Sequence, residues 1–61
     1  MGAALKTIRA LINEHEPLAI DRLRVCLSYV NDLELVDEAR HGSTAVPLID
    51  RLQPNLVFLD I

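Results

Sequence analysis

The sequence contains little of what commonly stabilises a small protein. Its 61 residues include one cysteine, one tyrosine, one phenylalanine and no tryptophan. Cys26 has no partner for a disulfide within the chain, which favours a reducing, cytoplasmic setting. No apolar run approaches the roughly 20 residues that span a bilayer. A chain of this length buries only about 60% of the surface that its unfolded form exposes, so stability depends on a core of Leu, Ile, Val and Ala.

Basic residues and glycines are also scarce. Six Lys and Arg stand against nine Asp and Glu, which gives a net charge of -3, and the basic residues are spread singly. Such spacing makes no patch that follows a phosphate backbone, so we expect no direct binding of nucleic acid by these residues. No glycine-rich turn follows the first predicted strand, which excludes a Rossmann dinucleotide site.

The remaining pattern alternates between strand and helix signals. It predicts strands at 7–12, 33–36 and 55–60, and helices at 17–30 and 44–52. The apolar side of the first helix is predicted to comprise Ala19, Leu23, Cys26, Leu27 and Val30. Cys26 is therefore expected in the core, and Leu18, Ile20 and Val25 lie off this stripe. The last strand is apolar without alternation, as is typical of a strand buried on both faces.

Strand–helix–strand–helix–strand order predicts an α/β fold with parallel strands joined by right-handed crossovers. In such sheets ligands gather at the carboxyl ends of the strands. The stretch Asn13-Glu14-His15-Glu16 follows the first strand, and Asp60 ends the third. We therefore expect these polar residues to share one edge of the sheet.

Three interpretations of this edge are open from the residues alone. Glu14, His15 and Glu16 form a solvated turn, with Asp60 facing solvent at a strand end. Alternatively, their carboxylates and that of Asp60 hold a hard cation such as Mg²⁺, which prefers oxygen ligands. With the His15 imidazole as a ligand, the same group would instead favour Zn²⁺ or Ni²⁺.

Several stretches together resemble a known family. These stretches cover nearly all of the chain from Lys6 to Ile61. They are RALI followed by acidic residues and EPLA, then LRVCL, ELVDEARHG and QPNLVFLDI. They resemble the first half of the receiver domain of response regulators, of the kind attached to LytTR DNA-binding domains. The family fold is flavodoxin-like, with parallel strands in the order 2-1-3-4-5. Residues 1–61 are thus expected to form a partial receiver domain, a three-stranded parallel sheet in the order 2-1-3 with two helices.

The resemblance implies a signalling module rather than an enzyme. Asp60 matches the aspartate that accepts a phosphoryl group from a sensor histidine kinase. The acidic pair that holds Mg²⁺ beside that aspartate corresponds to Glu14 and His15, and Glu16 matches the acidic residue that often follows. The implied Mg²⁺ site of Glu14, His15 and Asp60 is therefore degenerate. We expect weak Mg²⁺ binding, because a neutral imidazole replaces a carboxylate.

The chain also departs from the family pattern. It ends at Ile61, and it contains neither the later Ser or Thr and Lys of the family site nor a DNA-binding effector domain. The alternative function is a phosphorylation-incompetent receiver remnant that acts as an interaction or oligomerisation module. Because the third strand would then be an apolar edge, we expect a homodimer or higher oligomer. The first helix docks on the kinase in this family, so Leu18, Ile20 and Val25 are candidates for a partner surface or for ordinary surface.

Overall fold

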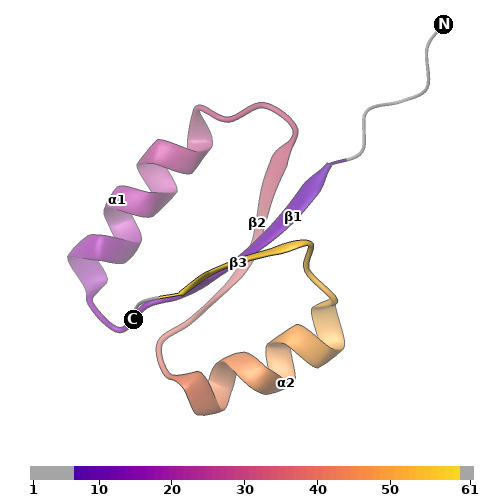
Figure 1. Cartoon of the computed structure of the whole chain (residues 1–61). Coiled ribbons are helices and arrows are strands. Elements are labelled where there is room, and N and C mark those ends of the chain that lie inside the picture. Colours follow the sequence, from indigo (N-terminus) through magenta and orange to yellow (C-terminus); the bar gives the residue numbers. More distant parts are fainter. Residues whose placement is uncertain (1–6, 60–61) are drawn as a thin grey trace, which may run out of the picture.

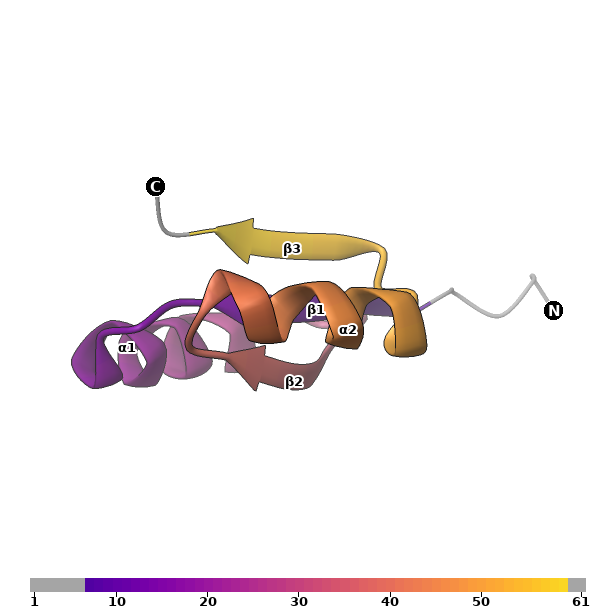
Figure 2. The same cartoon turned by 90° about the horizontal axis from the view of Figure 1, so that it is seen from below.

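The computed structural model describes residues 7–59, which form one three-stranded sheet with two helices. The elements in chain order are β1 (Ile8–Asn13), α1 (Pro17–Ser28), β2 (Leu33–Ala39), α2 (Gly42–Leu52) and β3 (Leu56–Leu59). Both strand pairs are parallel and the sheet order is β2-β1-β3. Figure 1 shows α1 and α2 on opposite faces of the sheet, and Figure 2 shows α2 in front of it. The predicted fold class and strand order are confirmed.

The core is centred on β1. Ala10, Leu11 and Ile12 have no exposed surface, because β1 has a strand on each side and a helix over each face. Ile20 of α1 and Ala45 of α2 are also buried. Within residues 7–59, neither helix is long and apolar enough to cross a membrane.

The structure corrects the predicted orientation of α1. Ile20 is 1% exposed, whereas Cys26 is exposed, so the expectation of Cys26 in the core and Ile20 outside the inward stripe is wrong. The inward stripe is instead Ile20, Leu23 and Leu27, the last two being half-buried. At about 100° per residue, Cys26 points about 120° away from Ile20. Val30, which was predicted on the buried side, lies beyond the end of the helix and is exposed.

Strand β2 continues to Ala39, past the predicted end at Val36. Its register against β1 shifts at Val36, and the next two residues, Asp37 and Glu38, still pair with β1. Their side chains leave opposite faces, as alternation along a strand requires. The Asp37 Oδ2 atom lies 4.0 Å from Nη2 of Arg51 in α2, and the Glu38 carboxylate forms an ion pair with Arg24 of α1. Polar residues continue this strand because each helix supplies a basic partner.

Helix α2 begins earlier than predicted, at Gly42, because the His41 carbonyl accepts hydrogen bonds from the amides three and four residues ahead, at Thr44 and Ala45. Pro47 consequently lies inside the helix, where it has no N–H to donate to a preceding carbonyl. At the other end, the Arg9 guanidinium of β1 donates to the carbonyls of Leu52 and Gln53. This contact fixes the end of α2 to the beginning of β1.

Candidate functional site

The carboxyl edge of the sheet is built around Asn13, the last residue of β1. Asn13 pairs with Ala39 of β2 on one side and with Leu59 of β3 on the other. The next residue, Glu14, donates its backbone N–H to the Ala39 carbonyl at 2.9 Å. The turn with the predicted site residues therefore begins at the centre of this edge.

Glu14 and His15 point to different environments. The Glu14 side chain is only 14% exposed, and its Oε2 accepts a hydrogen bond from the Glu16 backbone N–H at 3.1 Å. The His15 side chain is 70% exposed, and its Nδ1 lies 3.7 Å from the same oxygen of Glu14. The Glu14 carboxylate is thus directed along the turn, with one oxygen already in a hydrogen bond.

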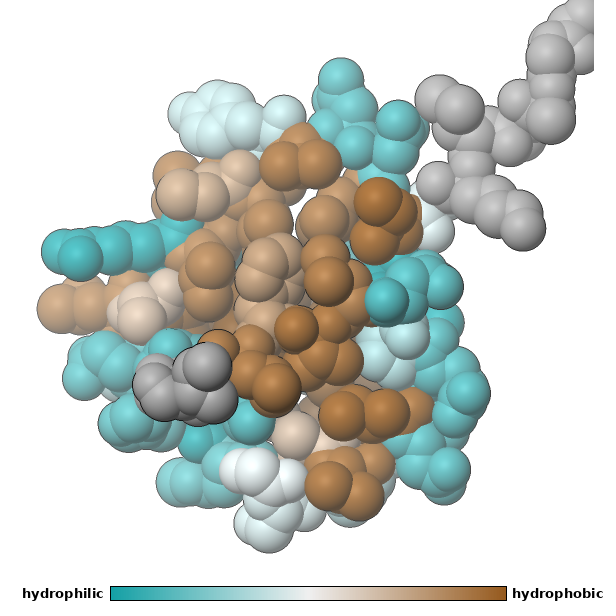
Figure 3. All heavy atoms as spheres, viewed as in Figure 1, coloured by the Kyte–Doolittle hydropathy of each residue, from teal (hydrophilic) through white to brown (hydrophobic). Residues whose placement is uncertain are grey.

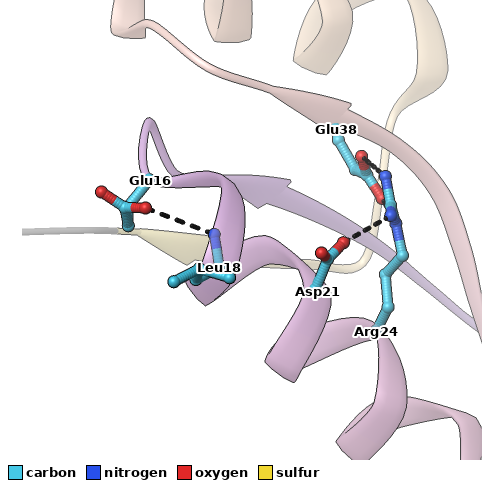
Figure 4. A network of polar contacts seen from close by, with 5 residues as sticks. All are labelled: Glu16, Leu18, Asp21, Arg24 and Glu38. Carbon is cyan, nitrogen blue, oxygen red and sulfur yellow. Dashed lines mark hydrogen bonds and ion pairs between the residues drawn. The ribbon is translucent and has the colours of Figure 1, made fainter.

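Glu16 starts helix α1. Its backbone is extended, and its Oε1 accepts a hydrogen bond from the Leu18 backbone N–H at 3.3 Å, which makes Glu16 the N-cap (Figure 4). Pro17 occupies the first helical turn as predicted, where its missing N–H leaves no bond unmade. A carboxylate at this end also interacts favourably with the helix dipole. The sequence did not reveal this capping role, because Ser, Thr, Asp and Asn are the usual N-cap residues; only the proline at the first helical position was a signal for the helix start.

The structure tests only part of the predicted metal site. It brings Glu14 and His15 together, but Asp60 lies outside the described residues. Between residues 7 and 59, no group of three or more His, Cys, Asp or Glu side chains could hold a metal ion. The Mg²⁺ site with Asp60 and the Zn²⁺ or Ni²⁺ alternative therefore stay predictions.

A second polar cluster connects α1 to β2. The Arg24 guanidinium donates two hydrogen bonds to the Glu38 carboxylate, one of them 2.6 Å from Nη2 to Oε1, and a third to Asp21 at 2.9 Å (Figure 4). The hydrogen-bonded Glu38 carboxylate raises the pKa of Arg24, and Asp21 adds to the effect. This bidentate pair fixes the position of α1 along the sheet. Sequence reasoning missed it, because Glu38 was placed in a loop.

The outer side of α1 carries a second set of apolar residues. A shallow hollow of about 380 Å³ is lined by Leu18, Asp21, Arg22, Val25 and Cys26. Leu18, Val25 and Tyr29 follow one another at helical spacing and are all exposed. The expectation that Leu18 and Val25 lie off the inward stripe is confirmed, and they form an outward stripe on the helix.

Comparison with known proteins relates this chain to transcriptional regulators. Over 54 residues, 88% of the chain, it is 39% identical to the transcriptional regulatory protein BtsR of Salmonella typhi and of Escherichia coli K12. It is 41% identical to a response regulatory protein of Yersinia pestis and 35% identical to the DNA-binding transcriptional activator EvgA of Escherichia coli K12. The chain spans about a quarter of the length of these relatives, 23% for BtsR and 26% for EvgA. No family model and no solved structure matches it. These similarities support a response-regulator domain.

Proposed function

We propose that this chain is the first part of the receiver domain of a two-component response regulator, with Asp60 as the acceptor of a phosphoryl group from a sensor histidine kinase. The observation that carries the proposal is the similarity to response regulators over 54 residues, together with the parallel sheet in the order β2-β1-β3. In this proposal the receiver controls a DNA-binding effector domain of the LytTR type. It acts as a signalling module and not as an enzyme.

The chemistry assigned to Asp60 is attack on a phosphohistidine. A carboxylate oxygen forms the new bond to phosphorus, the phosphorus–nitrogen bond breaks, and the departing imidazole nitrogen keeps the electron pair. In the sequence Asp60 follows Leu59, which pairs with Asn13 directly before the acidic turn. The described residues fit Mg²⁺ poorly, because one Glu14 oxygen is hydrogen-bonded and His15 replaces a carboxylate. We retain weak Mg²⁺ binding as a prediction and assign no step to the cation.

The outward stripe of α1 is the proposed contact surface for the kinase. Leu18, Val25 and Tyr29 are 64%, 58% and 82% exposed, and the hollow between the first two has an almost entirely apolar surface. Exposed apolar side chains at i, i+7 and i+11 are suited to packing against a partner helix. Because Arg24 fixes α1 to β2, this stripe is presented in one orientation.

The test uses acetyl phosphate as the phosphoryl donor and intact-mass spectrometry as the measurement. We expect a small fraction of the chain to gain one phosphoryl group at Asp60, because the described residues fit poorly the Mg²⁺ that would neutralise the phosphoryl charge. Asp60→Asn should abolish the gain. Asp50→Asn is the matched control, since Asp50 is an exposed aspartate on α2, and it should leave the gain unchanged. A mass gain that persists in Asp60→Asn would exclude Asp60 as the acceptor.

The second candidate function is association through β3. Among the described strands β3 pairs only with β1, and Leu56 and Leu59 are exposed apolar residues on it. Figure 3, viewed from the β3 side, shows apolar atoms gathered over this strand and toward both helices. Such an edge is a template for another strand, which favours a homodimer or higher oligomer.

Sedimentation of the 61-residue chain tests this second candidate. Leu59→Lys, which places a charge on the β3 edge, should shift the population from oligomer to monomer. Tyr29→Lys replaces an even more exposed apolar residue at the C-cap of α1 and should leave the population unchanged. A parent chain that sediments as a folded monomer at micromolar concentration would rule out the oligomerisation module.

A further inference from the structure

The acidic turn after β1 contains a relay of hydrogen bonds that leads into α1. The backbone N–H of Glu14 donates a hydrogen bond to the Ala39 carbonyl. The Glu14 carboxylate accepts a hydrogen bond from the Glu16 backbone N–H, and the Glu16 carboxylate accepts one from the Leu18 backbone N–H. The last two links each move two residues toward the helix. We propose that Glu14 and Glu16 are positioning residues for the first turn of α1, and that this use of their carboxylates leaves them poor ligands for a hard divalent cation.

The start of α1 presents backbone donors that need partners from outside the helix. The first amide groups of a helix have no acceptor within the helix and need one from elsewhere. Glu16 supplies an acceptor for Leu18, and Glu14 supplies one for Glu16 itself. Withdrawing the Glu14 carboxylate toward a cation would remove the acceptor of the Glu16 amide and loosen the turn that holds the N-cap.

The ligand chemistry leads to the same conclusion. Mg²⁺ requires oxygen ligands in near-octahedral geometry and gives up its water reluctantly. In the turn it would find one carboxylate of Glu14 with an oxygen in use, an imidazole, and the Glu16 carboxylate folded back onto the helix. The arrangement therefore suits a helix start better than a cation.

The effect is confined to the first turn of the helix. Further along α1, Arg24 is bound to Glu38 of β2 and to Asp21, without any contribution from Glu14 or Glu16 (Figure 4). Loss of the relay should therefore free the turn around Leu18 while the middle of α1 stays in place. Because Leu18 lines the outer hollow, Glu14 also controls the shape of the proposed contact surface.

Amide hydrogen exchange and Mn²⁺ broadening of NMR signals, with Mn²⁺ as the probe cation, provide the test. Glu14→Gln keeps an oxygen acceptor but removes the charge, so we expect unchanged exchange at Glu16 and Leu18. Glu14→Ala removes the acceptor and should speed exchange at both amides by about fivefold, the size of a typical capping effect. Glu34→Gln, which neutralises an exposed residue on β2, is the charge control and should change neither amide. In the parent chain Mn²⁺ should not selectively broaden the signals of Glu14 and Glu16.

Two results would overturn the proposal. One is selective Mn²⁺ broadening at Glu14 and Glu16 that disappears in Glu14→Gln, which would identify a cation ligand. The other is unchanged exchange at Glu16 in a folded Glu14→Ala chain. If Glu14→Ala does not fold, the Mn²⁺ measurement on Glu14→Gln still decides the question.

The inference rests on the proposed function only in that it concerns the cation of the same site, and the two can fail separately. Absence of any acetyl phosphate product at Asp60 would refute the phosphoacceptor assignment and leave the exchange result intact. A cation bound through Glu14 would refute the positioning role and leave Asp60 available as acceptor.

Discussion

Replacing Ile20 by alanine tests which side of α1 contributes to the core. Ile20 is 1% exposed, and truncation of a fully buried aliphatic side chain to alanine costs about 2–5 kcal/mol. We expect about 2–3 kcal/mol, because α1 covers a small sheet and can relax into part of the space. A chain of 61 residues has roughly 3–9 kcal/mol of stability at about 0.05–0.15 kcal/mol per residue. The unfolded-to-folded ratio should therefore rise about 30- to 150-fold.

The matched control for Ile20→Ala is Cys26→Ala on the same helix. Cys26 is exposed, so its substitution should change the free energy of unfolding by less than about 0.5 kcal/mol. Urea unfolding followed by far-ultraviolet circular dichroism measures both variants, since the chain has no tryptophan. Equal losses of stability in the two variants, or a larger loss in Cys26→Ala, would show that the orientation of α1 described above is wrong.

Three further predictions concern the polar contacts. Arg9→Met should lower the free energy of unfolding by about 1.5–3 kcal/mol in urea titrations, because the carbonyls at the end of α2 lose a charged donor. His15→Asp should strengthen Mg²⁺ binding in a calorimetric titration by adding a hard carboxylate ligand, and an equal or weaker affinity would show that residue 15 does not face the site. The raised pKa of Arg24 means that its contribution to stability is fully present below the ordinary pKa of arginine and is lost only as the pH rises through the higher folded value. Arg24→Gln should therefore lower the urea midpoint by the same amount at pH 6 and pH 9, both far below the pKa of arginine; a difference that disappears by pH 9 would contradict this assignment.

The sheet was predictable because its signals are local. Alternating strand and helix segments, joined by short turns, leave few arrangements other than parallel strands with crossovers. The orientation of α1 was harder to predict, since Leu18, Ala19 and Ile20 are three consecutive apolar residues and allow more than one inward stripe. Only packing of α1 against the sheet selects Ile20.

The charged end of β2 shows a second limit. Asp37 and Glu38 have low strand propensity, so the pattern alone ended the strand at Val36. Their partners Arg51 and Arg24 come from two different helices, a relation that only the folded chain establishes. For the acidic turn, the sequence located Glu14, His15 and Glu16 at the sheet edge. It could not show where the carboxylates point, because that depends on the backbone path into α1.

The charges on β2 also determine in which direction the sheet can grow. Glu34, Asp37 and Glu38 place charged side chains on one border of the sheet, the last two beside Arg51 and Arg24, and charged side chains on a border strand discourage a neighbouring chain from adding to it. The opposite border, β3, carries exposed leucines and lacks such charges along Leu56–Leu59. The sheet is therefore asymmetric as an assembly surface. Any strand that extends it, from the same polypeptide or another, is directed to β3, and β2 remains the outer boundary.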